Sequence, residues 1–204
     1  KLESDKNKRK DYLIEIQSDR LLLEKELLQK QKIAQKIENI ILGLQKDETE
    51  MKRRELELVK IRAKQKKATA GNFASLKGRM PWPVKGKIIT HFGKQHNKIL
   101  NTVTENSGID ISVSPNSPVT PVLDGVVTTV TFLRGYGNLI IIDHGGGYFS
   151  VYANVENIVV QENDYVQQYN SIATVSSQQS EGSRLHFEIW GNKQKLDPEN
   201  WLIK

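Results

Sequence analysis

The chain of 204 residues has no cysteine, which is compatible with an oxidising compartment but does not establish one. Its apolar runs are short, and none approaches the ~18 uninterrupted apolar residues of a transmembrane helix. No signal peptide is present, and Lys1 lies in the middle of a helical pattern, so we expect a processed or trimmed chain. These features predict a protein without direct membrane insertion.

Proline and glycine are scarce in the N-terminal part of the chain. Residues 1–67 contain no proline and one glycine, Gly43, and carry 19 Lys and Arg against 13 Asp and Glu. The remaining residues contain all six prolines, 13 of the 14 glycines and equal numbers of acidic and basic side chains. This division predicts an α + β multidomain chain, with a helical arm over 1–67, a linker or short helix over 68–79 and a globular domain over 80–204.

The helical arm carries the whole net charge of +6. A basic excess can indicate nucleic acid, anionic lipid or acidic partners. Here the basic residues are interleaved with acidic ones along a periodic pattern, which favours a solvated helix face. No aromatic residue occurs in the basic stretch 60–67, which weakens the case for binding single strands. We therefore expect no nucleic-acid partner.

Apolar residues in the arm recur at alternating steps of three and four, as in a coiled-coil heptad seam over about six heptads. One uninterrupted helix of about 60 residues would be roughly 90 Å long, and Gly43 and the stretch 46–50 are the expected places for a bend. An exposed seam needs a partner, which could be a second copy, a preceding segment, the chain folding back or the globular domain. Both a passive spacer and a partner-docking or regulatory arm stay open. Ten of the fourteen seam positions are apolar, and the seam comprises Leu13, Ile16, Arg20, Leu23, Leu27, Lys30, Ala34, Ile37, Ile41, Leu44, Glu48, Met51, Glu55 and Leu58.

From Lys85 onward, short runs of β-branched residues alternate with turn signals, and no segment longer than one turn has a helical period. The pattern predicts a mostly antiparallel β domain, with a polar loop over 94–107. The expected strands are 87–91, 108–113, 119–122, 125–134, 138–143, 148–154, 158–160, 171–176 and 185–190.

Short motifs in this domain occur in a recognisable order, at 107–111, 117–119, 123–126, 135–138, 143–145, 152–154, 160–166 and 185–188. In this order they resemble the LytM (lysostaphin-type) domain, over about residues 80–204. That family contains zinc endopeptidases that cut the peptide cross-links of bacterial peptidoglycan. Five positions are catalytic in its active members. The resemblance implies that two zinc ligands are retained as Asp110 and His186, that Asn106 replaces the third, and that Asn154 and Arg184 replace the two auxiliary histidines.

The chemistry of these residues agrees with a loss of activity. Catalytic zinc needs three protein ligands and an activated water, and only Asp110 and His186 are suitable donors. Asn106 offers a neutral carbonyl, and Arg184 places a positive charge beside the site of a divalent cation. Without a held metal or auxiliary histidines, neither water activation nor general acid–base help remains. We therefore expect no catalysis, no metal site and no cofactor.

The other histidines offer no clear replacement ligand. His144 lies in a turn motif where the active family also has His, so we expect a structural role. His91 lies near a strand end and could line the groove, but its spacing does not place it on a metal. His96 falls in the polar loop and is expected to be solvated.

The helical arm, Trp82 between two prolines and the degenerate domain together resemble the EnvC-like murein hydrolase activators. In that family the LytM domain is non-catalytic and activates cell-wall amidases by contact. Its coiled coil docks on the extracytoplasmic part of the FtsEX complex, and a helical element can occlude the groove until it is released. The resemblance implies a bacterial periplasmic or otherwise extracytoplasmic location. It also implies a cell-wall amidase and an FtsEX-like membrane complex as partners, with peptidoglycan as a further candidate.

The expected partner-binding groove comprises Asn106, Asp110, Tyr136, Tyr152, Asn154, Arg184 and His186. Arg184 is the strongest candidate, because a guanidinium presents a fixed fork of donors suited to a carboxylate or carbonyl. Tyr136 and Tyr152 would add apolar contact area, and Asp110 is expected to pair with Arg184 or His186. The alternative is structural fill after loss of the metal.

Two other functions stay open. One is an active zinc endopeptidase with unusual ligands. The other is a periplasmic coiled-coil adaptor, because 160–166 and Ser171 with Ile172 echo an element of lipoyl-like domains. The usual glycines of that element are here Asn163, which tolerates a positive φ, and Tyr169, which predicts that the second turn differs.

Overall fold

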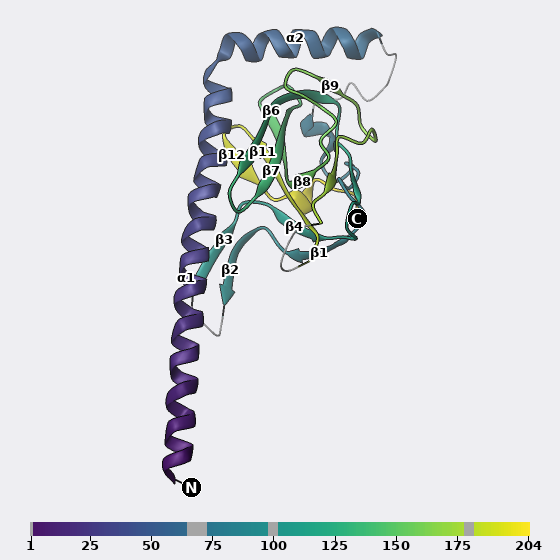
Figure 1. Cartoon of the computed structure of the whole chain (residues 1–204). Coiled ribbons are helices and arrows are strands. Elements are labelled where there is room, and N and C mark those ends of the chain that lie inside the picture. Colours follow the sequence, from purple (N-terminus) through teal and green to yellow (C-terminus); the bar gives the residue numbers. More distant parts are fainter. Residues whose placement is uncertain (1, 65–72, 98–101, 178–181) are drawn as a thin grey trace.

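The computed structural model describes residues 2–64, 73–97, 102–177 and 182–204 (Figure 1). Two helices, α1 (Leu2–Lys46) and α2 (Glu48–Lys64), lie outside a β-rich domain. They meet at Asp47, whose side chain accepts a hydrogen bond from Glu50 N and whose carbonyl accepts one from Met51 N, as expected of a helix N-cap. The bend therefore falls within the stretch 46–50, where the sequence predicts one.

The β domain is built from antiparallel strands, as predicted. Its main sheet has the order β1-β4-β11-β8-β7-β6-β9, with β10 pairing with β5 and β8, and β12 pairing with β11. These strands are β1 (Lys87–Thr90), β4 (Ile109–Ser112), β5 (Pro118–Val119), β6 (Gly125–Leu133), β7 (Gly137–Asp143), β8 (Tyr148–Glu156), β9 (Tyr165–Val166), β10 (Ala173–Val175), β11 (Arg184–Gly191) and β12 (Gln194–Leu196). A separate two-stranded ribbon consists of β2 (Gly93–Asn97) and β3 (Thr102–Asn106).

The central strands are apolar on both faces, so both faces need a cover. Successive side chains of a strand point to opposite faces. In β8, Tyr152 belongs to the main core, whereas its neighbours Val151 and Ala153 belong to a second cluster on the outer face. Helix α1 covers this second cluster, and the buried side chains that meet there are Ile33, Ile37, Ile41, Leu139, Ile141, Phe149, Val151, Ala153 and Trp190.

The domain begins and ends at one place. Phe73, in the one-turn helix η1 (Phe73–Leu76), is buried and stacks on Tyr148, with ring centroids 4.7 Å apart. Its ring also lies 5.2 Å from that of Trp201, which follows the short helix η2 (Pro198–Asn200). A β-bridge between Met80 and Leu202 joins the two ends of the domain. The segment after the helices is thus fixed to the domain at Phe73.

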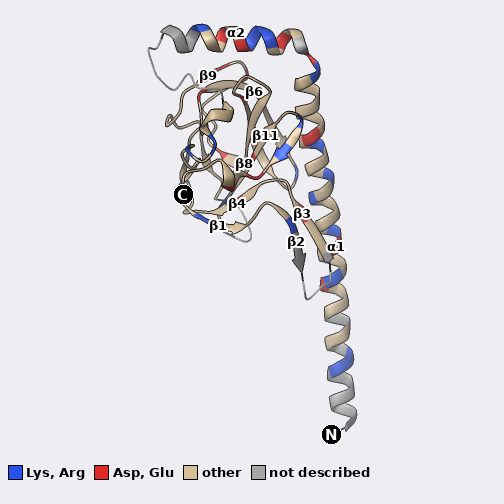
Figure 2. Cartoon of the chain, turned by 180° about the vertical axis from the view of Figure 1, so that it is seen from behind, with Lys and Arg blue, Asp and Glu red and all other residues tan. Residues whose placement is uncertain are grey.

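The two halves of α1 differ in environment. Ile37 and Ile41, on the predicted seam, are completely buried against the β domain, whereas Leu13, Ile16 and Leu23 are exposed. In Figure 1 the N-terminal half of α1 extends beyond the β domain. Figure 2 shows Lys and Arg alternating with Asp and Glu along α2, and charged residues of both signs among uncharged ones on α1, which agrees with a solvated outer face. The C-terminal half packs on the globular domain, one of the partners that the seam allows.

Three local expectations were wrong. The stretch 94–107 was expected to be a loop, but β2 and β3 pair across it. Residues 158–160 form no strand; here Val159 N donates to Ile172 O within an irregular segment. Tyr169 was expected to change the second turn, but it adopts φ 71°, close to the 73° of Asn163, with its side chain exposed.

None of the helices in the described part of the chain has the length and hydropathy of a membrane span.

Candidate functional site

Strands β4 and β11 place the two retained ligand-type residues side by side. His186 lies directly opposite Asp110 in the antiparallel register, so the two side chains leave the same face of the sheet. Asp110 Oδ1 is 2.8 Å from His186 Nδ1. Glu188, two residues along β11 on the same face, places its Oε1 2.9 Å from His186 Nε2. Asp110 therefore pairs with His186, and both ring nitrogens of the imidazole face a carboxylate.

These contacts determine the charge of the site. Burial opposes the charged form of His186, but its hydrogen bonds to Asp110 and Glu188 outweigh this and raise its pKa to about 9. Burial would raise the pKa values of Asp110 and Glu188, yet the bond to His186 lowers both. At neutral pH the three groups form a buried imidazolium between two carboxylates.

Two further side chains donate hydrogen bonds to the carboxylate of Glu188. Ser107 Oγ donates to Glu188 Oε1 at 2.5 Å, and Trp190 Nε1 donates to Glu188 Oε2 at 2.6 Å. Tyr136 packs edge-on against the His186 ring, with centroids 4.6 Å apart. Burial raises the pKa of Tyr136, and the charges of Glu188 and Asp110 raise it further. The floor of the site is thus completed by neutral donors and an aromatic ring.

Asn106 and Asn154, which the resemblance places at histidine positions of active relatives, are engaged with the backbone. Asn106 Nδ2 donates to His91 O at 3.2 Å, and its Oδ1 accepts from Gly108 N at 3.4 Å, so its amide group stabilises a turn. Asn154 has φ 63°, a left-handed conformation that Asn tolerates better than most residues. Its N–H donates to Tyr136 O, and its carbonyl accepts from Ser176 N, both at 2.8 Å. Backbone geometry therefore accounts for an asparagine at 154.

The residues present do not fit a zinc ion. A histidine ligand must offer an unprotonated nitrogen, whereas both ring nitrogens of His186 lie within hydrogen-bond distance of a carboxylate. The amide of Asn106 is turned to the backbone, and Arg184 lines the same cavity as a permanent cation. Among the described residues, no cluster of three or more His, Asp or Glu side chains has an arrangement that could hold a metal.

Helix α1 lies across this site. Leu27, Lys30 and Gln31 close a cavity of about 140 Å³ from the arm side. Its walls come from β1, from the β2–β3 ribbon and from the β6–β7 turn, and they include Thr90, Gln95, Thr104, Glu105, Gly135 and Tyr136. Its floor contains Asn106, Asp110, Asn154, Arg184 and His186, so the structure brings together the five residues that the resemblance assigns to catalytic positions. We refer to the floor and walls together as the groove.

Gly135 shows how closely α1 approaches the groove. A Cβ atom at Gly135 would lie 2.6 Å from Ile33 Cδ1, and the residue has φ 101°. Both the close approach and the positive φ favour glycine at this position. The β6–β7 turn is therefore shaped to the helix that covers it.

Three other sequence expectations, for Tyr152, His91 and His144, can be compared with the structure. Tyr152 was expected in the groove, which is wrong: its side chain is fully buried in the core, where the hydroxyl bonds Val122 N and Ser150 Oγ. His91 points its Nδ1 at Glu199 Oε1, 2.7 Å away, rather than into the groove. His144 is buried with its nitrogens near Asp124 O and Ser150 Oγ, which fits the expected structural role. The side chain of His96 lies outside the described residues.

Sequence reasoning missed Glu188 and Ser107 as parts of the site. Glu188 belongs to a motif that was noted, but its side chain had no assigned role. The signal was its position two residues after His186 in a predicted strand, which puts both side chains on one face. Ser107 could be assigned only once the cross-strand register was known.

Comparison with known proteins places this geometry in a family. Residues 104–198 match the sequence profile of Peptidase family M23. The chain is 38% identical over 122 residues to murein hydrolase activator NlpD of Salmonella dublin, which covers 59% of this chain and 30% of NlpD. It is 30% identical over 133 residues to murein hydrolase activator EnvC of Escherichia coli, covering 65% of this chain and 31% of EnvC. The chain thus spans about a third of the length of these relatives.

A solved structure supports the fold. The crystal structure of a zinc-containing peptidase from Vibrio cholerae superposes with a TM-score of 0.55 at 23% identity, covering 63% of this chain and 41% of that one. The family match and the superposition therefore agree on the fold of the β domain. The β domain of this chain is a Peptidase family M23, or LytM-type, domain, similar to those of the murein hydrolase activators NlpD and EnvC.

Proposed function

We propose that this chain is a non-catalytic activator of a cell-wall amidase, acting in bacterial cell separation outside the cytoplasm. One observation carries the proposal: the five residues that the resemblance assigns to zinc-binding and catalytic positions line a single groove, and their contacts do not fit zinc. A groove that is retained without its chemistry is suited to binding another protein. The similarity to NlpD and EnvC supports the same function.

Arg184 is the central contact in this proposal. It begins β11 on the floor of the groove, and it shares the cavity with Asn106 and Asn154. Its guanidinium suits a carboxylate or backbone carbonyl of the amidase. The Asp110, His186 and Glu188 charges are engaged with one another, so they act as a rigid floor rather than as partner contacts.

In the resting state of the proposed activator, helix α1 covers the groove. Because Leu27, Lys30 and Gln31 cover the groove, an amidase can reach Arg184 only after α1 has moved. The exposed apolar side chains on the other half of α1 would then dock on an FtsEX-like membrane complex, which favours release. They comprise Tyr12, Leu13, Ile16, Leu21, Leu22, Leu23 and Leu28.

An amidase activation assay tests the proposal. Purified chain is mixed with the cognate amidase and peptidoglycan, with and without residues 1–67, and released fragments are measured. We expect stimulation in both cases and more after removal of the arm. Arg184→Glu in the arm-deleted chain should abolish stimulation, whereas Arg79→Glu, at an exposed arginine outside the groove, should not. Persistent stimulation by the Arg184→Glu protein would show that the groove is not the contact surface.

The zinc endopeptidase alternative is tested with the same material. The protein alone is incubated with peptidoglycan, and its metal content is determined after exposure to zinc. We expect no released peptides and no stoichiometric zinc. Either finding in the opposite sense would replace the activator proposal with a hydrolase.

A further inference from the structure

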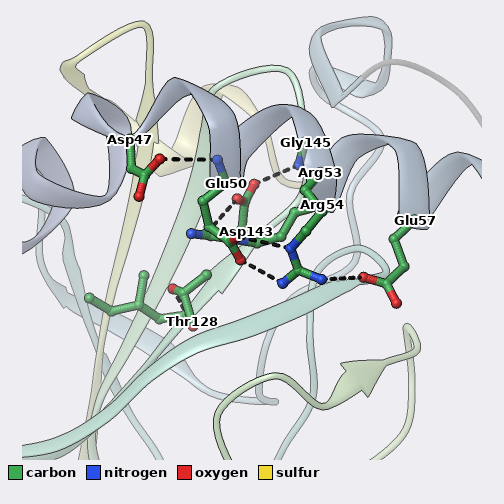
Figure 3. A network of polar contacts seen from close by, with 9 residues as sticks. Asp47, Glu50, Arg53, Arg54, Glu57, Thr128, Asp143 and Gly145 are labelled. Atoms are coloured by element: carbon green, nitrogen blue, oxygen red, sulfur yellow. Dashed lines mark hydrogen bonds and ion pairs between the residues drawn. The ribbon is translucent and has the colours of Figure 1, made fainter.

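The corner between α1 and α2 grips the turn between β7 and β8 at three points. Gln45 Nε2 donates to Gly147 O at 3.4 Å, and Arg54 Nη1 donates to Asp143 Oδ2 at 3.1 Å. Leu58 is fully buried over Gly145, where an added Cβ would lie 3.6 Å from Leu58 Cδ1. Figure 3 shows Arg54 of α2 reaching down to Asp143 beside Gly145. We refer to these contacts as the corner clasp, comprising Gln45, Arg54, Leu58, Asp143, Gly145 and Gly147.

The ion pair between Arg54 and Asp143 is the contact of the corner clasp that depends most on both partners being present. The side chains of Arg54 and Asp143 are only 8% and 2% exposed. Burial raises the pKa of Asp143, although Gly145 N–H and the Arg54 guanidinium beside it act in the opposite direction. A buried pair of this kind contributes little net stability, but removal of one partner leaves a buried, uncompensated charge. The pair is therefore sensitive to any change at Arg54.

Outside the corner clasp, α2 is only weakly attached to the β domain. A space of about 350 Å³ separates the helix from strands β6 and β9, and it is lined by Arg53, Arg54, Glu57, Val126, Asn163 and Tyr165. Leu56 and Val59 point outward and are 62% and 56% exposed. Among the described residues, the attachment of α2 is thus concentrated at Arg54 and Leu58.

We propose that the corner clasp is a second lock, remote from the groove, which keeps α1 over the groove by fixing its C-terminal end. This regulatory role rests on the proposed activator function. Gln45 ends the last turn of α1, Arg54 belongs to α2, and both hold the same β7–β8 turn across the single residue Asp47. Release of the clasp therefore frees the base of α1 together with α2.

Loss of Arg54 destabilises the closed arrangement, in which α1 and α2 lie on the β domain. When α2 leaves, water reaches Asp143 and hydrates its carboxylate, so the open arrangement does not need the arginine. Truncation of Arg54 raises the cost of the closed state alone. The cost of an unpaired buried charge corresponds to a roughly 100-fold or larger rise in the ratio of open to closed molecules.

Single introduced thiols measure this ratio, because the chain has no cysteine of its own. Val126→Cys, in a position 6% exposed, reports access beneath α2, and Val151→Cys, fully buried, reports access beneath α1. Val175→Cys, fully buried in the main core, reports unfolding of the β domain. Each is placed in the otherwise unchanged chain and in the Arg54→Met chain, and the rate of reaction with a maleimide is measured.

We expect Arg54→Met to accelerate modification at 126 and 151 by roughly 100-fold relative to the core probe. Arg53→Met is the matched control, because Arg53 is 59% exposed and pairs with Glu50 and Glu57 of its own helix. It should leave both rates unchanged. Adding Asp143→Asn to Arg54→Met removes the orphaned charge and should restore protection.

Three results would overturn the lock: unchanged rates, acceleration at 126 alone, or equal acceleration at all three probes. Acceleration at 126 alone would show that α2 opens without α1. Equal acceleration would show that Arg54 supports the whole β domain. The measurement contains no amidase, so its failure is distinguishable from a failure of the proposed activator function.

Discussion

Replacement of Ile37 by alanine tests whether the apolar contact beneath α1 keeps the groove covered. Ile37 is fully buried between Ile33 and Ile41 and faces the outer cluster on β7 and β8. When α1 leaves the sheet, the same side chain is exposed to water on a free helix. The substitution therefore weakens the closed state and has little effect on the open one.

The magnitude follows from the burial. Truncation of a fully buried isoleucine to alanine costs about 2–5 kcal/mol, and a contact that can partly collapse lies near the lower end. A loss of about 3 kcal/mol raises the ratio of open to closed molecules roughly 150-fold, since each 1.4 kcal/mol is a factor of ten. Alanine is also the best helix former, so α1 itself is not weakened.

The assay is amidase stimulation by the full-length chain, together with the reactivity of a Val151→Cys thiol beneath α1. Both should rise in the Ile37→Ala protein. Leu22→Ala is the matched control, because Leu22 lies on the same helix but is 58% exposed. If Ile37→Ala left both readouts at the level of Leu22→Ala, the apolar contact would not be what holds α1 on the domain.

Three further predictions concern the floor of the groove. Asn154→Ala should lower the free energy of unfolding by about 1 kcal/mol in urea titrations, whereas Asn154→Gly should be near neutral, because the residue has φ 63°; equal losses would show that φ is not the reason. The pKa of His186 is about 9 in the folded protein against 6.5 as its ordinary value, so the stabilisation is complete below pH 6.5 and is lost as pH rises through 9. The urea midpoint should therefore fall over this range by the equivalent of about 3 kcal/mol, and a flat profile would contradict a buried imidazolium. Asn106→His should not produce stoichiometric zinc binding in calorimetry, because both nitrogens of His186 remain engaged with Asp110 and Glu188; tight zinc binding would refute the assigned charges.

The helical arm shows what a sequence pattern can and cannot specify. The heptad seam correctly marks Ile37 and Ile41 as inward-facing, and the bend lies in the predicted stretch. The seam does not identify the element on which it packs, because an apolar stripe packs as well on a sheet as on another helix. Its other half, represented by Leu13 and Ile16, is exposed here, so the coiled-coil pairing stays a prediction.

The β domain was predictable where strands are apolar and less so elsewhere. Strands β6, β7, β8 and β11 carry dense β-branched or aromatic side chains, and they lie close to their predicted positions. The β2–β3 ribbon was missed because its sequence is polar on both faces and has no period-two signal. The pairing of Asp110 with His186, rather than with Arg184, depends on cross-strand register, which no local pattern contains.

The five former catalytic positions divide according to what they touch. Asp110 and His186 are a cross-strand pair, and with Glu188 they bond one another within the sheet. Loss of either would leave a buried charge without its partner, so the fold itself accounts for their retention without zinc chemistry. Asn106, Asn154 and Arg184, which the resemblance places at histidine positions of active relatives, all line the cavity that Leu27, Lys30 and Gln31 of α1 close. Asp110 and His186 line the same cavity, so the arm covers all five residues, which is the arrangement expected if this surface is shaped by a protein partner and by the helix that competes with it.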